Sequence, residues 1–575
     1  MSKSLLQTDI KSGEINLTDK LSEDFSKLYL SANYSDVTFI VEDEKIFGHK
    51  VILAARSDYF RAMFYSGLSE STKAEIQLKE IKKDSFKILL KYIYSGKINL
   101  KMLTSQMSLI LDLLGLVNLF GYNELKDEIS TFLKNSLKLS NVCNILDASR
   151  LYELTSLTNM CYSFIDKNAE ELLTHETFKY LYKDSLILLL ARDSFYADEV
   201  QIFKAVSQWI DANSDLKPEE IKEVVNNIRL PLISTIDLLE VVRSTGILDA
   251  DTILDAIQVR EQSKFRLPHR GRLYIEEDVA TNKYGARVIQ GISDGFSVLE
   301  DSSHAYDMEK GYTRHAITGK NDDNGIIVEL GNIYIINFIK ILLWDLDNRS
   351  YSYVIDVCVE LDHWERIIDY SAYHCRSWQY LYFPNRPVKY IRIKGTHNTV
   401  NRVFHLVSME AMCTSNQPKI VNGIISPKIN VATVDKSATV LEGVSRNKNS
   451  LLNGNVKDYD WDCGYTCHQL GSGNILIQLG QPYLIGSFRL LLWDCDERFY
   501  SFYIETSVNE TTWEMIVDKR NERLQSWQTF SFEPRVITYI RIVGTYNSAN
   551  EIFHIVHFEC PAQEQSQEKN QALIQ

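Results

Sequence analysis

A short pattern of aromatic, acidic and basic residues occurs twice in this sequence. Two stretches share the form Trp-Asp-x-Asp-x-Arg: Trp344, Asp345, Asp347 and Arg349, then Trp493, Asp494, Asp496 and Arg498. Two carboxylates before an arginine could line a polar ligand pocket or a cation site. They could equally cap the amides of a turn while the arginine pairs with them. Copies of one domain share framework as readily as function, so the framework interpretation is favoured, and the ligand pocket is kept as the alternative.

Histidine and cysteine residues offer weaker candidates for chemistry. His405 and His554 each follow a phenylalanine, which favours strand-end histidines held by local hydrogen bonds over catalytic ones. Cys463, Cys467 and His468 resemble half of a metal site, but no second Cys/His pair lies nearby, so free thiols are favoured. No phosphate-binding glycine loop, zinc-protease motif or kinase signature set is present. The sequence therefore predicts no catalytic residue, no metal site, no cofactor and no enzymatic activity.

The repeated pattern is part of a much longer repeat. Trp378 recurs as Trp527 and Gly395 as Gly544, both at an offset of 149 residues (527 − 378 = 149). No insertion or deletion interrupts this register. The period is too long for a solenoid repeat, so it indicates two copies of one whole domain.

Two kinds of element must position these residues. The second half alternates strand-like runs such as IINFIKILLW with Gly, Asn, Asp and Pro turns, which predicts an antiparallel β-sandwich or jelly roll in each copy. In the first half, two alternating strands in SDVTFIVEDEKIFGHK precede helical segments, and residues from about 136 to 257 have helical spacing throughout. The predicted fold class is multidomain, with an α/β domain, an all-α region and two all-β sandwiches.

Composition limits the partners. A formal net charge of −14 argues against a nucleic-acid partner, because binding phosphates requires a surplus of Lys and Arg on some face. No apolar run is long enough to span a bilayer or to act as a secretory signal. The 9 cysteines are scattered in no disulfide pattern, which is typical of a reducing compartment. We expect a soluble, cytoplasmic protein.

The stretch YSDVTFIVEDEKIFGHKVILAARSDYFRAMF, which begins at Tyr34, resembles the BTB/POZ domain along most of its length. In that family the positions of Asp36, His49 and Lys50 are buried polar groups under a dimer interface, so the resemblance implies a homodimer. A buried Asp and Lys would have to pair with each other or with the backbone to offset their desolvation.

The remaining segments resemble two further families. The helices from about residue 136 to 257, with DSFYADEVQIFKAVSQWI as their clearest part, resemble the BACK region of adaptor proteins, and the repeats resemble discoidin domains, also called coagulation factor 5/8 type C domains. The second copy fits the N-terminal discoidin pattern, whereas the first keeps only GYTRH, so its loop is predicted to be divergent. The expected domains are an N-terminal tail (1–20), BTB/POZ (21–135), BACK (136–258), a basic linker (259–272), discoidin-like domain 1 (273–415), a linker (416–425), discoidin-like domain 2 (426–561) and a disordered tail (562–575).

BTB proteins that recruit cullin-3 present a hydrophobic-x-Glu triplet after the helix pair, and this chain has Leu68-Ser69-Glu70 there. Such a triplet is common by itself, but its context favours a cullin contact over a solvated turn. Leu68 would enter a pocket of the cullin and Glu70 would accept hydrogen bonds, with Phe64 and Tyr94 as neighbours.

These resemblances imply a dimeric adaptor that binds cullin-3 through BTB and BACK and a client protein through the discoidin-like pair. The candidate client pocket consists of the two Trp-Asp-x-Asp-x-Arg clusters and Trp461. The alternative is a cytoplasmic BTB scaffold that acts without cullin and whose discoidin-like domains bind protein or membrane ligands. A membrane surface is the weaker partner, because the segment around Trp461 is acidic where anionic lipid requires basic residues.

Overall fold

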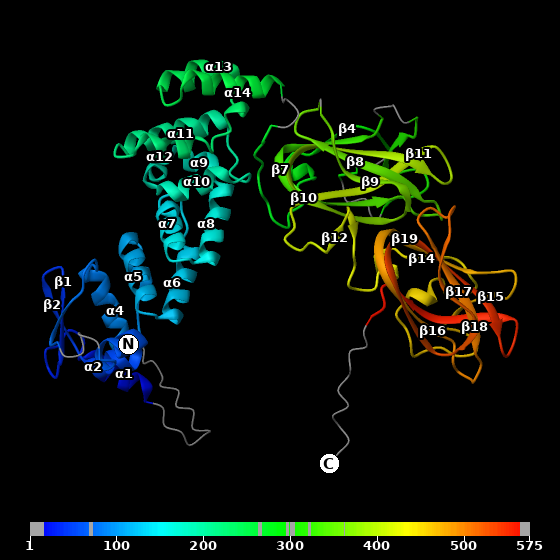
Figure 1. Cartoon of the computed structure of the whole chain (residues 1–575), viewed down its shortest axis with the longest axis horizontal. Helices are drawn as coiled ribbons and strands as arrows, with labels where there is room; N and C mark the ends of the chain where they lie inside the picture. Colours follow the sequence, from blue (N-terminus) through cyan, green and yellow to red (C-terminus); the bar gives the residue numbers. More distant parts are fainter. Residues whose placement is uncertain are drawn as a thin grey trace, which may run out of the picture. The chain divides into compact units, whose positions relative to one another are not determined.

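The computed structural model describes residues 17–67, 73–262, 267–294, 298–299, 305–319, 324–361 and 363–563. It divides into two compact units, residues 1–257 and 258–575, which are treated separately below (Figure 1). The predicted Leu68-Ser69-Glu70 triplet lies outside the described residues, as do most of the predicted N-terminal tail and all but two residues of the predicted C-terminal tail. Among the described residues, no helix has both the length and the apolar character needed to cross a membrane.

The first unit begins with a small sheet in the strand order β2-β1-β3. β1 (Val37–Val41) alternates buried and half-buried residues and pairs antiparallel with β2 (Glu44–Gly48), as the alternating sequence predicts. A two-residue turn, Glu42-Asp43, joins them with φ values of 47° and 66°, the left-handed turn that suits a tight hairpin. β3 (Glu75–Gln77) then adds parallel to β1.

Helices complete the first unit. Those of the BTB part are α1 (Thr18–Ser26), α2 (Lys50–Arg56), α3 (Asp58–Tyr65), α4 (Lys83–Ser95), α5 (Met107–Leu119) and α6 (Asn123–Asn135). Those of the BACK part include α7 (Val142–Leu151), α8 (Thr155–Lys167), α9 (Ala169–Thr174), α10 (Lys183–Ala191), α11 (Glu199–Ala212), α12 (Pro218–Val225) and α14 (Ala250–Gln262). One hydrophobic cluster extends from Val37 to Ala256, so the two parts share a continuous core.

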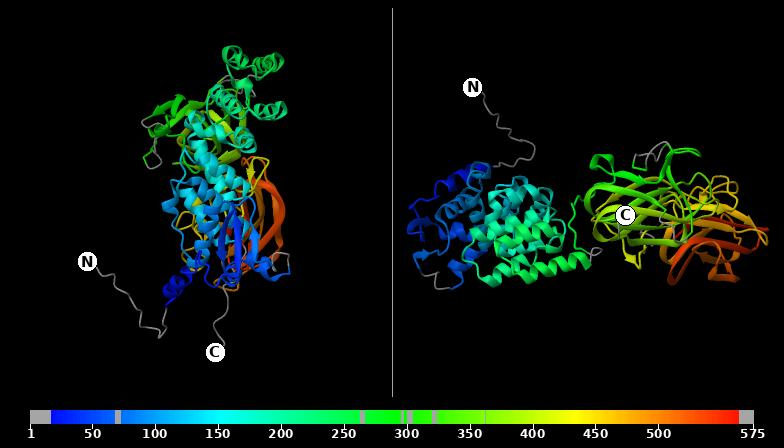
Figure 2. Two further views of the ribbon diagram at one scale, coloured as in Figure 1. Left: turned by 90° about the vertical axis from the view of Figure 1, so that its left-hand side faces the viewer. Right: turned by 90° about the horizontal axis from the view of Figure 1, so that it is seen from above.

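The second unit consists of two β-sandwiches, as the repeat predicts (Figure 2). The first contains β4 (Arg287–Gln290), β5 (Ile292–Asp294), β6 (Tyr312–Ala316), β7 (Ile326–Leu343), β8 (Tyr351–Cys358), β9 (Glu365–Cys375), β10 (Trp378–Asn398) and β11 (Val403–Met412). The second contains β12 (Ile420–Val421), β13 (Ile424–Ile425), β14 (Thr439–Glu442), β15 (Thr466–Gln469), β16 (Ile475–Leu492), β17 (Tyr500–Ser507), β18 (Glu514–Leu524), β19 (Trp527–Asn547) and β20 (Ile552–Glu559). β7 to β10 correspond end to end to β16 to β19 at the sequence offset, and each sandwich has its own apolar core.

The two sandwiches meet through buried amides. The Gln481 side chain accepts a hydrogen bond from Tyr380 N at 2.6 Å and donates one to Tyr380 O at 3.1 Å. Gln379 Nε2 donates to Gly480 O at 2.8 Å, and Gln478 Nε2 donates to Ser350 Oγ at 2.7 Å. The three glutamine side chains have no exposed surface, so the junction leaves little freedom between the copies.

The segments that lead into the sandwiches are part of the sheets. In the segment predicted as a linker, β12 pairs with β13, and Ile425 of β13 pairs in parallel with Tyr483 of β16. Ahead of the first sandwich, Arg272 lies beside the edge at Tyr334: its N–H donates to Ile333 O at 2.8 Å and its carbonyl accepts from Ile335 N at 2.9 Å. Tyr334 corresponds to Tyr483 at the repeat offset, so a lead-in segment pairs with the same edge position in both sandwiches.

Candidate functional site

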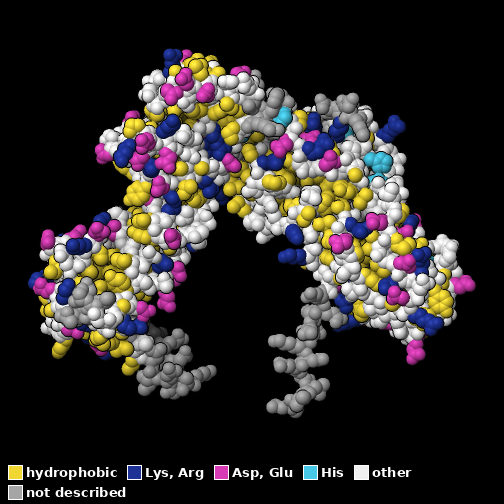
Figure 3. Space-filling view, in the orientation of Figure 1, with side chains coloured by type: hydrophobic (Ala, Val, Ile, Leu, Met, Phe, Trp, Pro, Cys, Tyr) yellow, Lys and Arg dark blue, Asp and Glu magenta, His cyan; other side chains and the backbone are white. Residues whose placement is uncertain are grey.

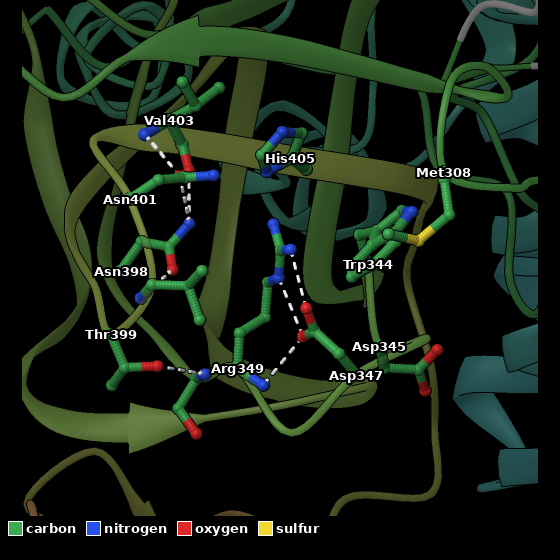
Figure 4. A network of polar contacts seen from close by, with 12 residues as sticks. Met308, Trp344, Asp345, Asp347, Arg349, Asn398, Thr399, Asn401, Val403 and His405 are labelled. Carbon is green, nitrogen blue, oxygen red and sulfur yellow. Dashed lines mark hydrogen bonds and ion pairs between the residues drawn. The ribbon is translucent and has the colours of Figure 1, made fainter.

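The turn after β7 carries the first Trp-Asp-x-Asp-x-Arg pattern (Figure 4). The Asp347 carboxylate accepts from Arg349 Nε at 2.8 Å, from Nη2 at 2.7 Å and from the Arg349 backbone N–H at 2.9 Å. These hydrogen bonds lower the pKa of Asp347. The guanidinium carbon lies 4.2 Å from the Trp344 ring centre. The Asp347 carboxylate and the Arg349 guanidinium are hydrogen-bond partners of each other. This is the pairing that the framework interpretation expects.

The second copy has the same geometry. Asp496 accepts from Arg498 Nε and Nη2, both at 2.7 Å, and the guanidinium carbon lies 4.4 Å from the Trp493 ring centre. The other carboxylate of each pattern is also engaged, since Asp345 accepts from the Tyr306 hydroxyl and Asp494 from the Tyr459 hydroxyl. The structure thus brings the eight predicted residues together as two similar buried or half-buried turns rather than as one site.

A loop above each turn carries an exposed residue. Trp344 Nε1 donates to Asp307 O at 2.8 Å, and Trp493 Nε1 donates to Asp460 O at 3.0 Å. The next residues along the chain are Met308 and Trp461, whose exposed fractions are 66% and 62%. The loop tip thus offers a ligand a large exposed apolar side chain in each copy, next to the buried tryptophan of the turn.

The prediction that the first loop keeps only GYTRH was wrong. Tyr306 and Asp307 make the same contacts as Tyr459 and Asp460, so the match begins earlier in the loop. The segment between β6 and β7 is longer than the one between β15 and β16, and this shifts the loop out of the register that aligns the strands. The two loops therefore differ at their tips, while the contacts that hold each loop to its turn are the same.

His405 and His554 belong to the core beneath these turns. Tyr351 OH lies 3.1 Å from His405 Nδ1, and Tyr500 OH lies 3.2 Å from His554 Nδ1. Burial lowers the pKa of each histidine to about 4, with the neighbouring arginine adding to the shift. These contacts agree with locally hydrogen-bonded histidines.

The Cys463, Cys467 and His468 group does not form a metal site. His468 Nε2 accepts the Gly544 N–H at 2.9 Å, and both cysteines are free. No group of three or more His, Cys, Asp or Glu residues with metal-binding geometry occurs within the described part of the chain.

The predicted polar residues of the BTB part differ in burial. His49 is buried, with its ring nitrogens 2.7 Å from Tyr94 OH and 2.8 Å from Asn33 O. Asp36 is exposed and accepts the Lys50 backbone N–H at 2.7 Å at the start of α2, and Lys50 is half-buried. The predicted burial of Asp36 and Lys50 concerns a dimer interface and stays a prediction. In the single chain the Asp36 carboxylate pairs with the backbone, one of the two arrangements anticipated for it.

Phe64 and Tyr94 are not surface neighbours of a cullin. Both belong to the core, where Phe64 stacks with Phe60 at a ring distance of 5.9 Å and Tyr94 holds His49. Burial raises the pKa of Tyr94 to about 12. Exposed apolar or aromatic residues of α3 and α5 include Tyr59, Tyr65 and Leu119, which the sequence analysis did not select. Their positions on the outer stripes of α3 and α5 were the signal that it missed.

Comparison with known proteins assigns the parts. Family models match residues 25–137 (BTB/POZ domain), 142–243 (BTB And C-terminal Kelch) and 434–558 (F5/8 type C domain). The chain is 54% identical to BTB/POZ domain-containing protein 9 of Drosophila melanogaster over 96% of its own length and 75% of that protein's. It is 49% identical to the human protein of that name, over 97% of this chain and 90% of that one. Kelch-like protein 6 of Homo sapiens is 29% identical over 41% of this chain and 37% of its own.

This chain belongs to the BTB/POZ domain-containing protein 9 family. The F5/8 type C model covers only the second sandwich, but the first has the same strand layout and the same Trp-Asp-x-Asp-x-Arg turn. Members of the BTB/POZ domain-containing protein 9 family thus combine BTB, BACK and C-terminal β-sandwich domains, and none of the three matched models describes an enzyme domain.

Proposed function

We propose that this protein is a dimeric, non-catalytic adaptor of a cytoplasmic cullin-3 ubiquitin ligase, and that its β-sandwich pair binds the client. The BTB–BACK order, which Kelch-like protein 6 shares over 236 residues, supports an adaptor role. The adaptor supplies no chemistry. It raises the effective concentration of a client lysine near the charged conjugating enzyme, and a dimer presents two such arms.

A groove in the BTB domain carries the cullin part of the proposal. Its cavity of about 630 Å³ lies between α3, β3 and the end of α5, and Tyr59, Met63 and Leu119 line it. Leu119 is 53% exposed and lies beside Tyr59 in the groove lining, so the two form a small exposed apolar surface. Lys73 and Glu75, which follow the Leu68-Ser69-Glu70 triplet in sequence, also line the groove. An apolar segment of cullin-3 in this groove would bury Leu119 and Tyr59.

A second apolar surface supports dimerisation. A cavity of about 580 Å³ lies between α1, α2 and α4, and Leu21, Phe25 and Val51 line it with largely exposed side chains. A second copy would cover the same residues by two-fold symmetry. Obligate interfaces of this kind rarely leave a folded monomer.

The adaptor role is tested by measuring the binding of purified cullin-3 to the full chain by calorimetry. Leu119→Asp should weaken binding at least about tenfold, because it places a charge in the apolar groove. Leu68→Asp with Glu70→Lys should do the same. The matched control is Met102→Asp, an exposed apolar residue of the same domain outside the groove. Unchanged affinity of the Leu119→Asp chain would remove the groove from the proposal, and no binding by the unaltered chain would remove cullin-3.

Co-sedimentation with anionic vesicles separates the adaptor from the scaffold alternative. On the face shown in Figure 3, Lys and Arg side chains are interspersed with Asp and Glu, so no broad basic surface is visible there. Vesicle binding without cullin-3 binding would favour the scaffold.

A further inference from the structure

A cavity of about 480 Å³ lies between β10 of the first sandwich and β16 of the second, with residues of both in its lining. Tyr380 and Tyr382 of β10 form one wall and Tyr483 of β16 forms another. The lead-in segment of the second sandwich closes the cavity with Pro418, Pro427 and Ile429, and three lysines, Lys419, Lys428 and Lys436, surround it. The cavity is distant in sequence from both loop tips and belongs to neither sandwich alone.

The polar side chains that line this cavity can all donate hydrogen bonds, and the three lysines can only donate. None of the described residues hydrogen-bonds to the hydroxyls of Tyr380, Tyr382 or Tyr483, and none of the described carboxylates pairs with the three lysines. The lining contains no Asp or Glu. Burial raises the pKa of Tyr382 and of Tyr483, so both phenols stay protonated. Lys436 lies over the Tyr380 ring, and Lys419 and Lys428 are exposed beside it, so in a chain with a net charge of −14 this is a local group of cations that suits an anionic ligand.

The first sandwich can be compared directly at the corresponding position, because its own tyrosine side chains occupy that space. Tyr334, the counterpart of Tyr483, packs against Tyr274 at a ring distance of 5.9 Å and against Tyr284 at 6.2 Å. Tyr284 ends a short 3₁₀ turn (Asn282–Tyr284), and Lys436 ends the matching turn (Val434–Lys436). The second copy thus has an ammonium where the first has an aromatic ring, and its lead-in segment supplies Ser426 and Pro427 instead of a covering tyrosine.

The walls of the cavity are fixed. Gln481 holds the backbone of Tyr380 from both sides, and the Ile425–Tyr483 bridge ties the lead-in segment to β16. Asn430 Oδ1 accepts from Ala432 N at 3.0 Å and from Cys560 N at 2.8 Å, which anchors the end of that segment. Because the cavity is preorganised in this way, little binding free energy is lost in ordering it when a ligand binds.

We propose that this junction cavity binds a short acidic peptide segment of the client. Carboxylates of the peptide would meet Lys419, Lys428 and Lys436, its carbonyl oxygens would accept from the tyrosine hydroxyls, and its apolar side chains would cover Ile429 and the prolines. The aromatic and proline lining suits an extended backbone. The inference rests on the proposed function, since it specifies how the sandwich pair recognises a client.

The probe is a displayed library of short random peptides selected on the full chain, followed by fluorescence anisotropy of an enriched peptide. Enriched sequences should be acidic. Lys428→Glu with Lys436→Glu should weaken their binding about tenfold, because exposed pairs of about 0.2–1 kcal/mol each are replaced by repulsion. The matched control, Lys283→Glu with Lys448→Glu, makes the same charge change away from the cavity and should bind normally. A second variant, Ser426→Tyr, keeps every charge but fills the cavity and should also abolish binding.

Two outcomes would overturn the proposal. Enriched peptides that are not acidic, or that bind the double lysine variant with unchanged affinity, would exclude the cavity as a peptide site. Full competition by inorganic phosphate, or binding of phosphatidylserine vesicles that is lost in the double lysine variant, would assign it to a phosphate-bearing ligand instead. Calorimetry with cullin-3 separates this inference from the adaptor role: a chain that binds cullin-3 but no acidic peptide defeats the cavity alone, and a chain that binds the peptide but not cullin-3 defeats the adaptor alone.

Discussion

The first and second β-sandwiches make the same contacts beneath their loop tips but present different residues above them. In both, a bidentate Asp–Arg pair lies against a buried tryptophan, and a tyrosine hydroxyl engages the other carboxylate. At the tip, one copy exposes Met308 and the other Trp461. At the junction, one copy covers Tyr334 with its own tyrosines while the other leaves Tyr483 facing a cavity. Residues that recur in both copies therefore hold the fold together, whereas residues that differ between the copies form the candidate binding surfaces.

The largest effect should come from a glycine common to both frameworks. A Cβ at Gly395 would overlap the Phe404 side chain, and one at Gly544 would overlap Phe553. Gly395→Ala and Gly544→Ala should each lower the free energy of unfolding of their sandwich by about 3 kcal/mol through overpacking. Urea denaturation measures this loss. Gly319→Ala, where the added methyl group meets open space, is the control, and a tolerated substitution in either copy would show that its core is not packed as described.

A smaller, equal loss is expected at the two arginines. Arg349→Met and Arg498→Met each remove the hydrogen bonds to the aspartate and the contact with the tryptophan ring, which should cost about 2 kcal/mol. Thermal unfolding of the two variants tests the equivalence. A loss confined to one copy would mean that the other pair serves a ligand rather than the fold.

The buried histidines predict a loss of stability in acid. The pKa of His405 and of His554 is about 4 in the folded chain against an ordinary value of 6.5, so between these values the unfolded chain binds more protons. Stability should therefore fall as pH drops from 6.5 towards 4, by about 1 kcal/mol per histidine at about pH 5.5. Unfolding curves of His405→Gln and His554→Gln across this range should show a weaker pH dependence than the unaltered chain. Identical slopes would place the acid sensitivity elsewhere.

The smallest effect on stability should come from exchanging the tips. Met308→Trp changes an exposed side chain and should alter the free energy of unfolding by less than about 0.5 kcal/mol. Trp461→Met also removes the ring contact with Trp493 at 4.5 Å and should cost about 0.5–1 kcal/mol. Quantitative proximity labelling of the variants then asks whether the set of bound proteins changes. An unchanged set would turn attention from the tips to the junction cavity.

The strands of the repeats could be predicted from the sequence, because β7 to β10 align with β16 to β19 without an insertion or deletion. A shift of one residue in either copy would place the apolar side chains on the solvent face of the sheet. Prediction failed at the loop before β6, where a length change outside the strands moved Tyr306 and Asp307 out of alignment. The contact between the two sandwiches could not be predicted for a different reason. Glutamine is usually a surface residue, and Gln379 and Gln481 are buried only because the other sandwich covers them. The sequence pattern within one copy gives no sign of that contact.

The BTB part shows a similar limit. The family resemblance predicted a buried His49, as the structure has it, but the predicted cullin neighbours Phe64 and Tyr94 are core residues. Whether a helical residue faces the core or the solvent depends on which stripe the rest of the domain covers. Only the packed structure distinguishes the buried Phe64 from the exposed Leu119.

The junction joins unlike faces of the two copies, and such a head-to-tail contact can in general be repeated without end to give a fibre. One of its faces remains uncovered here: Arg376 and Gln379 are buried against Gly480, whereas their counterparts in the second copy, Gln525 and Gln528, are exposed or half-exposed. The complementary face of the second copy, at Gly480 and Gln481, is occupied by the first copy. At the corresponding positions the first copy has Gly331 and Asn332, and the asparagine side chain is one methylene group shorter than that of Gln481. The first copy therefore lacks the glutamine that binds both backbone groups of Tyr380, and the chain does not carry a second copy of this contact surface.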